Sequence, residues 1–430
     1  MISSKIGVVG LWHLGCVISA SWSKLGSKVK GFDHNLERVE KLRRGVLPVY
    51  EPSLRGIITD NIQKGSLDFV TDMTDLSDCD FIFLTYDTPV LDDDSSDTSL
   101  LEKSVVELRE IMKDNSVLIV SSQSPVGFCS RLREILKETN STLEVSYSPE
   151  NLRLGEAIDC YLKPERIILG TNNHQTEERC TELFGMVTTN ILRMSLESAE
   201  MVKHGINSFL ATSIVFANNL ADLCEYSHAD INDVVRGMKS DVRIGQKAYL
   251  SPGIGFSGGT LGRDLRVLDQ KNSDMNGQAR LFGFIHDANS KRKETIVSKI
   301  ERIVNGLEKK RVGILGLTYK PGTSTLRRSL PLEIVNILLQ KRAIVKVYDP
   351  KADYSETSGI FKFEVAKDIE EISIDADILV LLTEWDDFVR FDWMKIRDKM
   401  KTPIFLDAKN ALNEREMNEK GFRYYPLGKS

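Results

Sequence analysis

The stretch that decides the fold reads Lys5-Ile6-Gly7-Val8-Val9-Gly10-Leu11-Trp12-His13-Leu14-Gly15. A short apolar run enters a glycine turn, and a helix-forming segment follows. Gly10 and Gly15 stand at the first and third glycine positions of the Gly-x-Gly-x-x-Gly pattern. The first glycine permits a tight turn, and the third lets the helix pack close to the strand. The pattern predicts the opening strand, turn and helix of a Rossmann-like dinucleotide-binding domain.

Two nearby positions bear on the dinucleotide. Asp33 ends the next predicted strand, 23 residues after Gly10. An acidic residue there accepts hydrogen bonds from the adenosine ribose and repels a 2′-phosphate, which favours NAD over NADP. Trp12 stands where a glycine usually lets the backbone approach the pyrophosphate, so its indole must swing aside or reshape the loop. A Rossmann-like layer without any cofactor is the alternative.

Four polar side chains are further candidate cofactor contacts. Arg38 is a candidate partner of the ribose or a phosphate, with a solvated helix face as the alternative. Thr85, Thr88 and Ser122 follow predicted strands, and ligands of open α/β sheets bind beyond the carboxyl ends of strands. Ordinary turn chemistry is the competing explanation for these three hydroxyls.

Working outward, short apolar runs alternate with amphipathic helix-length segments such as 36–44 and 101–113. This alternation predicts a parallel sheet with helices on both faces. The predicted strands are 5–10, 28–33, 81–85, 117–121, 143–147 and 166–170.

The pattern changes at Ser195. From there to Tyr226 the chain has no proline, and apolar residues recur at helical spacing, which predicts one long helix. Further helical segments run to Gly306, and strand-like runs return at 311–317, 343–349, 378–383 and 403–407. The expected fold class is α/β, with two Rossmann-like doubly wound domains joined by a long central helix and a helical dimerisation segment.

Composition narrows the class of protein. The 430 residues exceed one ordinary domain, because single cores stop growing near ~250–300 residues. The net charge of −5 gives no sequence-wide basic character for nucleic acid or an anionic membrane. No apolar run approaches the ~20 residues of a membrane span. The six cysteines lack CxxC spacing, so we expect a cytoplasmic protein with reduced thiols and no metal site.

Six blocks, in order along the chain, resemble motifs of the UDP-glucose/GDP-mannose dehydrogenase family. Any one block is weakly specific, but six in order over nearly the whole chain are highly specific. They are SPENLRLG at 148–155 (family NPEFLREG), EMVKHGIN at 200–207 (ExxKxxxN), DVRIG at 241–245 (DxRIG), PGIGFSGGTLGRD at 252–264 (PGxGFGGSCFPKD), GLTYKPGTSTLR at 316–327 (GLAFKPxTxDxR) and TEW at 383–385 (TEW).

The resemblance implies NAD-dependent oxidation of the C6 alcohol of a nucleotide-linked sugar, normally to the carboxylate, by a cytoplasmic homodimer. It implies an NAD-binding domain over 1–194, a helical dimerisation domain over 195–306 and a UDP-sugar-binding α/β domain over 307–430. UDP-glucose is the leading substrate, because the block at 243–245 resembles the UDP-glucose branch most.

The resemblance also implies catalytic roles for Glu150, Lys203, Asn207, Thr260 and Asp264. Lys203 and Asn207 share a helix face, where Lys203 would stabilise charge on the C6 oxygen and Asn207 would position the sugar or a water. Glu150 would act as a base or polarise a water, and Asp264 would pair with Lys203 or a water. Without the resemblance, a solvated helix stripe, a helix cap and a turn aspartate are the plain alternatives.

Thr260 stands where the family normally has cysteine. The family's thiolate attacks the C6 aldehyde and forms a thioester, whereas a threonine hydroxyl is a far poorer nucleophile. Three outcomes are open. The enzyme hydrates the aldehyde and oxidises the gem-diol directly, or it stops at the aldehyde, or the chain is a weak or non-catalytic paralogue. We favour the first, because the other four catalytic positions are retained.

Further contacts follow from matched positions. Arg243 would reach the sugar in the partner subunit's active site, with a solvated arginine as the alternative. Trp12, Leu154, Gly262 and Arg263 depart from the family and suggest a variant NAD pocket. The remaining expected cofactor contacts are Leu14, Arg263 and Arg327, and the expected substrate contacts are Asn151, Leu152, Tyr249, Ser251, Gly255, Phe256, Tyr319, Lys320 and Lys409, the last replacing an arginine.

Two other classes of protein fit parts of the sequence. A hydroxyacid or 6-phosphogluconate-type dehydrogenase shares the NAD domain and helical bridge but needs no second α/β domain. A non-catalytic NAD-binding or nucleotide-sugar-binding protein is favoured by Thr260 and Trp12, and is opposed by Glu150, Lys203 and Asp264.

Overall fold

The computed structural model describes residues 4–89, 96–149, 152–153, 155–278, 280–357 and 363–430. Contacts between residues divide the chain into two compact units, Met1–Gly205 and Ile206–Ser430. The finer division at residues 195 and 307 stays a prediction.

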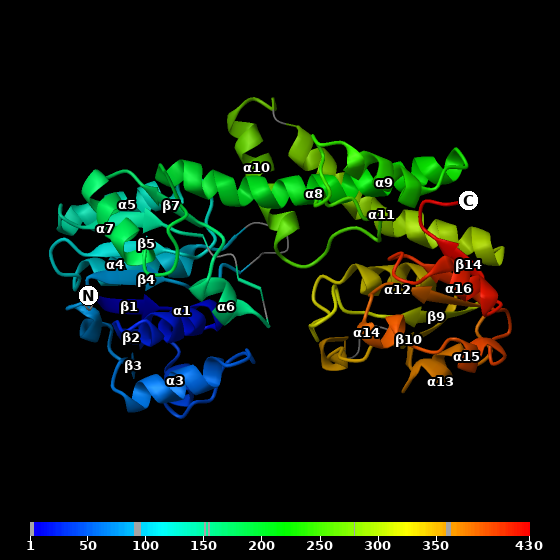
Figure 1. Ribbon diagram of the computed structural model, residues 1–430, viewed down its shortest axis with the longest axis horizontal. Coiled ribbons are helices and arrows are strands. Elements are labelled where there is room, and N and C mark those ends of the chain that lie inside the picture. Colours follow the sequence, from blue (N-terminus) through cyan, green and yellow to red (C-terminus); the bar gives the residue numbers. More distant parts are fainter. Residues whose placement is uncertain (1–3, 90–95, 150–151, 154, 279, 358–362) are drawn as a thin grey trace. The chain divides into compact units, whose positions relative to one another are not determined.

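The first unit is built on a sheet in the order β3-β2-β1-β4-β5-β6-β7-β8 (Figure 1). All described neighbours are parallel except β6 and β7, which are antiparallel, so the prediction of a purely parallel sheet is wrong at this pair. Between β6 and β7, the described part of the chain forms a short helix, α6, of six residues. The elements are β1 (Lys5–Val9), α1 (His13–Lys24), β2 (Lys28–Phe32), α2 (Leu36–Arg43), α3 (Leu54–Gln63), β3 (Leu67–Val70), η1 (Met73–Leu76), β4 (Phe81–Leu84), α4 (Ser99–Arg109), β5 (Val117–Val120), α5 (Phe128–Thr139), β6 (Glu144–Tyr147), α6 (Ala157–Leu162), β7 (Ile167–Thr171), α7 (His174–Phe184) and β8 (Ile191–Met194).

Helices cover both faces of this sheet because apolar side chains of a strand alternate between them. In β4, Phe81 and Phe83 pack with α1, α3 and α7, whereas Ile82 and Leu84 pack with α4 and α5. The expected doubly wound architecture is confirmed. It brings the carboxyl ends of β1, β2, β4 and β5 to one edge of the sheet, next to the turn at Gly10.

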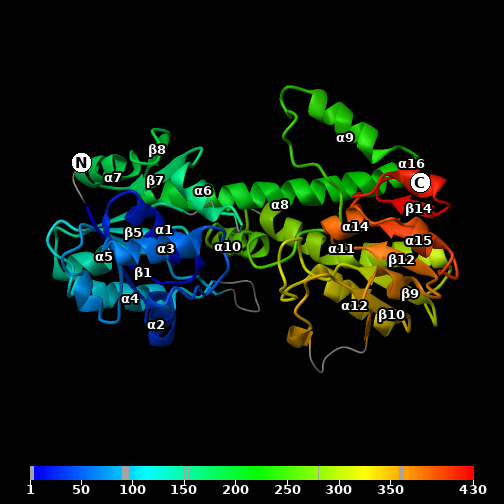
Figure 2. The same ribbon diagram turned by 60° about the horizontal axis from the view of Figure 1, so that its bottom comes forward.

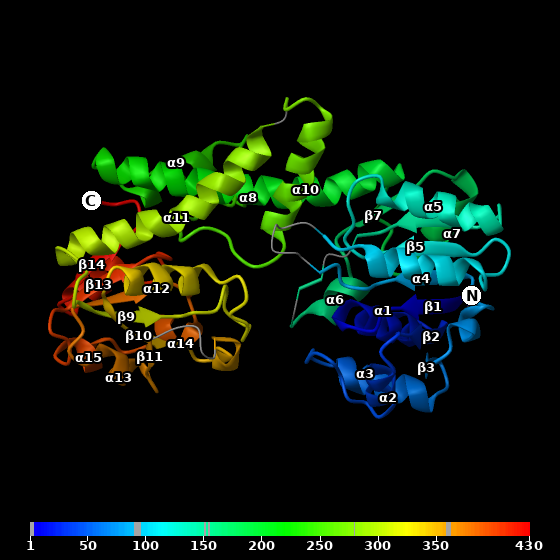
Figure 3. The ribbon, with the colours of Figure 1, turned by 180° about the vertical axis from the view of Figure 1, so that it is seen from behind.

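The second unit repeats this design on a parallel sheet in the order β11-β10-β9-β12-β13-β14. One face packs against α11 and α12, and the other against α13 to α16. Figure 3 shows α10 and α11 side by side. The elements are α9 (Ile231–Ser240), α10 (Leu261–Asp274), α11 (Leu281–Val304), β9 (Arg311–Leu315), α12 (Leu330–Gln340), β10 (Ile344–Tyr348), η2 (Tyr354–Thr357), β11 (Glu364–Val365), α13 (Ile369–Ser373), β12 (Ile378–Leu381), α14 (Asp386–Val389), α15 (Met394–Arg397), β13 (Ile404–Asp407), α16 (Glu414–Glu419) and β14 (Arg423–Pro426).

The predicted long helix is confirmed as α8 (Leu196–Tyr226), which Figure 2 shows as one unbroken rod. Three of the apolar positions that predicted it, Ala217, Ala221 and Cys224, are buried inside the chain. Part of the helical periodicity therefore reflects packing within one chain. None of the helices in the described part of the chain combines the length and apolar character that a membrane crossing requires.

The six cysteines are free thiols. Burial raises the pKa of Cys16 and of Cys180 to about 12, so both thiols stay neutral at physiological pH. Cys160 is the least buried of the six.

Candidate active site

The turn between β1 and α1 is shaped by its two glycines. Gly10 has φ +100°, and a Cβ there would lie 2.7 Å from the backbone nitrogen of Tyr86. A Cβ at Gly15 would lie 1.8 Å from the carbonyl oxygen of Gly10. Backbone therefore fills the space that side chains would need, and the turn forms a cradle at the N-terminus of α1. Such a cradle fits the pyrophosphate of a dinucleotide.

Trp12 occupies the position of the middle glycine. Its backbone is extended, at φ −82° and ψ −156°, a conformation open to any residue. Its indole lies over the guanidinium of Arg38, 5.0 Å from carbon Cζ to the ring centroid. The indole thus lies toward α2, and the effect of Trp12 on cofactor geometry stays a prediction.

Asp33 is buried at the end of β2 and gathers three donors. Its Oδ2 accepts hydrogen bonds from the backbone N–H of Leu11 at 2.7 Å and from Nη1 of Arg38 at 2.8 Å. Its Oδ1 accepts one from the N–H of Asn35 at 2.8 Å. The carboxylate therefore ties the glycine turn to α2, beside the expected ribose position.

Replacing Asp33 with alanine is expected to weaken NAD binding and to narrow the preference for NAD over NADP. Each hydrogen bond to a charged group is worth roughly 1.5–3 kcal/mol, so NAD affinity should fall about tenfold to a hundredfold. Titration calorimetry with both dinucleotides measures this. Asp68→Ala, at an exposed position of β3, is the control. Equal use of NAD and NADP by the unmodified protein would contradict the assignment.

The strand-end hydroxyls are engaged with backbone. The Thr85 hydroxyl donates to the carbonyl oxygens of Val9 and Gly10, at 3.0 and 2.6 Å. The Ser122 hydroxyl lies 2.7 Å from the Tyr86 carbonyl oxygen. These contacts join neighbouring strand ends, 36 to 76 residues apart in sequence, and are not local turn contacts. Thr88 is buried, and cofactor contacts for the three hydroxyls stay predictions.

Glu51 is a site residue that the sequence did not reveal. It is 2% exposed, and it accepts hydrogen bonds from the backbone N–H groups of Gly155 and Ala157 at 3.0 and 2.9 Å. Its Oε2 also lies 2.9 Å from Nε2 of His13. Burial by itself would raise the pKa of Glu51, but these donors outweigh it and hold the pKa below its usual value. The carboxylate thereby fastens the cofactor turn to the end of the 148–155 block.

Because the folded-state pKa of Glu51 is lowered, its stabilising effect is present above the ordinary pKa of 4.5 and is lost as pH falls through the folded-state value. Glu51→Gln is expected to lower the free energy of unfolding by roughly 1–3 kcal/mol at pH 7. The difference from the unmodified protein should shrink below pH 4.5. Urea unfolding at several pH values measures both, and Glu37→Gln on the exposed face of α2 is the control. A difference that does not vary with pH would contradict this explanation.

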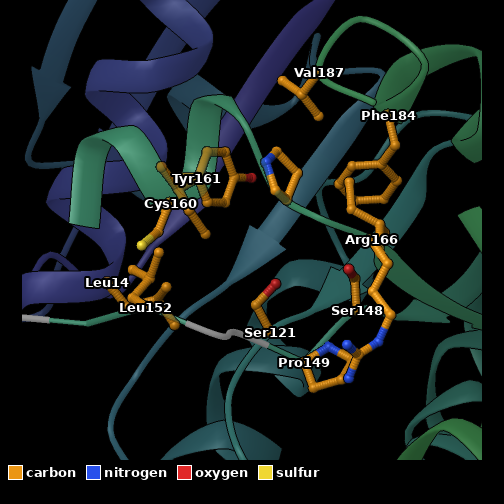
Figure 4. A pocket seen from close by; sticks show the side chains of 13 residues that line it. Leu14, Ser121, Ser148, Pro149, Leu152, Cys160, Tyr161, Arg166, Phe184 and Val187 are labelled. Carbon is orange, nitrogen blue, oxygen red and sulfur yellow. The ribbon is translucent and has the colours of Figure 1, made fainter. Parts of the chain in front are cut away.

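Glu150, Asn151 and Leu154 lie outside the described residues, so their predicted roles stay untested. Leu14 and Leu152 come together at a cavity of about 50 Å³ beyond the carboxyl ends of β5 and β6 (Figure 4). The cavity is lined by Leu14, Ile18, Ser121, Ser148, Pro149, Leu152, Cys160, Tyr161, Pro164, Arg166, Ile167, Phe184 and Val187. The geometry brings an expected cofactor contact and an expected substrate contact to one place.

Three of the predicted catalytic residues gather in the second unit. Asn207, on α8, donates a hydrogen bond from Nδ2 to Oδ2 of Asp264 in the first turn of α10. Both side chains are buried. Thr260 immediately precedes α10, and its carbonyl oxygen accepts from the Asp264 N–H at 3.2 Å. Lys203 is half-buried on α8, one helical turn before Asn207.

The glycine-rich loop before Thr260 reaches the end of β9. Gly258 has φ +81°, donates its N–H to the Arg328 carbonyl oxygen at 3.1 Å, and would place a Cβ 3.2 Å from the Tyr319 ring. Burial raises the pKa of Tyr319, so its hydroxyl is neutral and able to donate. The loop thus brings the expected substrate contacts Gly255, Phe256 and Tyr319 into one neighbourhood.

Lys320 also lies near this neighbourhood, with its Nζ 5.7 Å from the centroid of the Tyr319 ring, and Arg263 lies in the first turn of α10. Arg243 is 85% exposed at its side chain, and its Nη2 lies 2.6 Å from Oδ2 of Asp241. Lys409 pairs with Glu384 at 3.1 Å. Arg263 is buried, and Tyr249, Ser251, Lys320 and Arg327 are exposed. Within the described ranges, no group of His, Cys, Asp and Glu is arranged to hold a metal ion.

Comparisons with known proteins cover the whole chain. Residues 4–188 match the NAD binding domain of the UDP-glucose/GDP-mannose dehydrogenase family, residues 197–291 its central domain, and residues 313–414 its UDP binding domain. The chain is 31% identical to a UDP-glucose 6-dehydrogenase of Rickettsia bellii (strain RML369-C), over 99% of both chains. It is likewise 31% identical to a UDP-glucose 6-dehydrogenase of Pseudomonas aeruginosa, over 99% of this chain and 97% of the other.

Solved structures show the same architecture. A UDP-glucose dehydrogenase from Pyrobaculum islandicum superposes with a TM-score of 0.87 at 25% identity, over 99% of this chain and 98% of the other. A UDP-D-ManNAc dehydrogenase from Pyrococcus horikoshii superposes with a TM-score of 0.85 at 23% identity, over 99% of both chains, which shows likeness of fold.

Proposed function

The chain belongs to the UDP-glucose/GDP-mannose dehydrogenase family, and on that premise we propose that it oxidises the C6 alcohol of a UDP-sugar to the carboxylate with NAD. The family and the relatives directly support an NAD-dependent nucleotide-sugar dehydrogenase. We propose UDP-glucose as the substrate, and domains bounded at residues 195 and 307.

The observation that carries the proposal is the buried hydrogen bond between Asn207 and Asp264. It places a carboxylate and an amide beside the loop that ends at Thr260. NAD, when bound, takes the hydride that leaves C6. In the first oxidation Asp264, directly or through a water, accepts the proton of the C6 hydroxyl, and Lys203 stabilises the charge that develops on the C6 oxygen.

In the second oxidation, a water adds to the aldehyde and forms a gem-diol, for which a second bound NAD would supply the hydride acceptor. Glu150 takes a proton from that water. Thr260 donates a hydrogen bond to the C6 oxygen and forms no covalent bond. The second candidate is an enzyme that stops at the aldehyde, because Thr260 carries a hydroxyl where the family normally has a cysteine thiol.

A panel of UDP-, GDP- and dTDP-sugars tests the substrate. NADH formation is expected with UDP-glucose, and with the other UDP-sugars at lower kcat/KM. Faster turnover of UDP-N-acetylmannosamine would move the assignment to that sugar within the same class. NADH formation only with GDP-sugars would contradict the assignment of the nucleotide.

We also propose that the chain forms a homodimer through α8. Phe209, Phe216 and Leu223 are 72%, 48% and 61% exposed and recur every seven residues. Such spacing lines one helix face with apolar surface, which monomers rarely expose over a large area. We therefore assign the dimer interface to these exposed residues rather than to Ala217 and Ala221.

The dimer predicts that Arg243 acts on the partner subunit's sugar. Arg243→Ala and Lys203→Ala subunits should each be nearly inactive alone. Mixed dimers should recover activity, because one of their two sites has both residues. Coexpression with two different affinity tags isolates the mixed dimers. The control pairs Lys203→Ala subunits with subunits that carry Arg236→Ala, on α9, in place of Arg243→Ala. Inactive mixed dimers of demonstrated composition would contradict action in trans.

A further inference from the structure

The loop between Leu250 and Leu261 is partly buried, although it contains no helix or strand. Gly253, Ile254 and Phe256 are all buried within it. Backbone N–H and C=O groups that leave water need partners, and a loop cannot find them in a regular ladder. The N–H of Gly258 donates to the Arg328 carbonyl oxygen, and the partners described for Gly253 and Phe256 are side chains of α8 and α11.

Asn289, on α11, pairs with the backbone of Phe256 in both directions. Its Oδ1 accepts from the Phe256 N–H at 2.8 Å, and its Nδ2 donates to the Phe256 carbonyl oxygen at 2.8 Å. Only a side-chain amide can accept and donate in this way. The fit is close, because a Cβ at Gly255 would lie 2.6 Å from Oδ1 of Asn289.

Gly253 is held from both sides. Nε of Arg292 donates to its carbonyl oxygen at 3.0 Å, and Oδ1 of Asn218 accepts from its N–H at 2.7 Å. The guanidinium is itself oriented by Asp222, whose two carboxylate oxygens lie 2.7 and 2.6 Å from Nη1. Arg292 is 5% exposed, so this ion pair is little screened on the arginine side.

We propose that Asn289 and Arg292 are positioning residues that set the location of Thr260 by holding the glycine-rich loop at Phe256 and Gly253. The inference rests on the proposed function of Thr260. The loop ends at Thr260, four residues after Phe256. Four residues further on, Asp264 accepts a hydrogen bond from Asn207. The segment that carries the hydroxyl is therefore fixed on both sides. A displacement of about 1 Å at a reacting group costs on the order of a hundredfold in rate.

Asn289→Leu tests the first positioning residue. It keeps the approximate size of the side chain but removes both hydrogen bonds to Phe256. We expect kcat to fall about a hundredfold while the KM for NAD changes less than about twofold, because the cofactor turn belongs to the other unit. Asn219→Leu is the matched control. Asn219 and Asn289 both line one cavity between α8 and α11, but Nδ2 of Asn219 donates to the carbonyl oxygen of Val215 in its own helix. An unchanged kcat in folded Asn289→Leu would overturn the proposal.

Arg292→Ala tests the second by chemical rescue. Arg292 lines a cavity of about 380 Å³ between α8 and α11, which has room for a free guanidinium ion. Guanidinium at low millimolar concentration is expected to raise the kcat of Arg292→Ala at least about tenfold. Ammonium is not expected to raise it. If the substitution only lowered stability, guanidinium would not restore kcat in preference to ammonium. A folded variant whose kcat guanidinium does not restore would overturn the role of Arg292.

Hydrogen exchange separates this proposal from the proposed function. Amides of residues 250–262 should exchange faster in Asn289→Leu than in the unmodified protein or Asn219→Leu, whether or not any sugar is oxidised. Unchanged protection would overturn the proposal even in an active enzyme. Faster exchange in a protein that oxidises no sugar would refute the proposed function while the loop restraint stood.

Discussion

Gly15→Ala is expected to weaken NAD binding by about tenfold to a hundredfold. The added Cβ would lie 1.8 Å from the Gly10 carbonyl oxygen and 2.8 Å from Oγ1 of Thr85. Neither atom belongs to a flexible side-chain end, because Thr85 is itself hydrogen-bonded to the turn. The helix α1 must therefore move away from the turn, and overpacking of this kind costs roughly 1–3 kcal/mol.

Gly56→Ala is the matched control for that experiment. Gly56 lies inside α3, and no atom lies within 4 Å of the position that its Cβ would occupy. NAD affinity should be unchanged, and the helix should gain roughly 0.5–1 kcal/mol in stability. Titration calorimetry with NAD compares the two variants. Unaltered NAD affinity in folded Gly15→Ala would contradict the assignment of this turn as the pyrophosphate site.

Thr260→Ala is expected to slow turnover by about a hundredfold to a thousandfold without abolishing the second oxidation. The substitution removes one hydrogen-bond donor to the C6 oxygen, which is worth roughly 2–4 kcal/mol in the transition state. Thr260→Ser should keep most of the activity, because the donor remains. Glu150→Gln should impair the conversion of aldehyde to acid more than the first oxidation, because attack by water needs a base.

A covalent role for Thr260 makes a different prediction. Aldehyde supplied directly, followed by rapid quenching and mass spectrometry of the protein, would then reveal a sugar adduct on Thr260 that forms and decays at the turnover rate. The non-covalent mechanism predicts unmodified protein at every time point. Thermal melting of each variant measures its stability, so that a loss of helix capping at the start of α10, which costs about 1 kcal/mol, is distinguished from an effect on turnover.

The strands that the sequence did not predict have one physical feature in common. β3, β8, β11 and β14 are the four outermost strands of the two sheets. An edge strand is flanked by a neighbour on one side only and needs no continuous apolar run. β8, for example, has two exposed residues among four. Most interior strands, such as β4, β5, β12 and β13, are buried on both faces, and their apolar runs were visible in the sequence.

The same distinction applies to the site. Gly10, Gly15 and Asp33 could be singled out because they lie within or directly after one strand–helix–strand unit, β1-α1-β2, whose spacing is a local pattern. Glu51 was not, because its partners Gly155 and Ala157 are more than a hundred residues away and are backbone groups, which leave no pattern in the sequence. Asn289 was missed because its partners are also backbone groups, those of Phe256, which lies 33 residues away.

The long helix shows how far periodicity reaches. Its apolar spacing predicted α8 to within one residue at its start, and its end was predicted correctly. The spacing did not separate Ala217 and Ala221, which face the interior of the chain, from Phe209 and Phe216, which face solvent. That separation depends on what packs against each face, and it became visible only in the folded chain.

The measurement that tests the central claim most directly is the amount of NADH formed per molecule of UDP-glucose consumed, with the product identified by mass. The account predicts two equivalents of NADH and UDP-glucuronate as the final product, from a protein whose Thr260 stays unmodified. One equivalent of NADH with the aldehyde as the final product would contradict the acid-forming mechanism. No NADH from any nucleotide-sugar would contradict the proposed function itself.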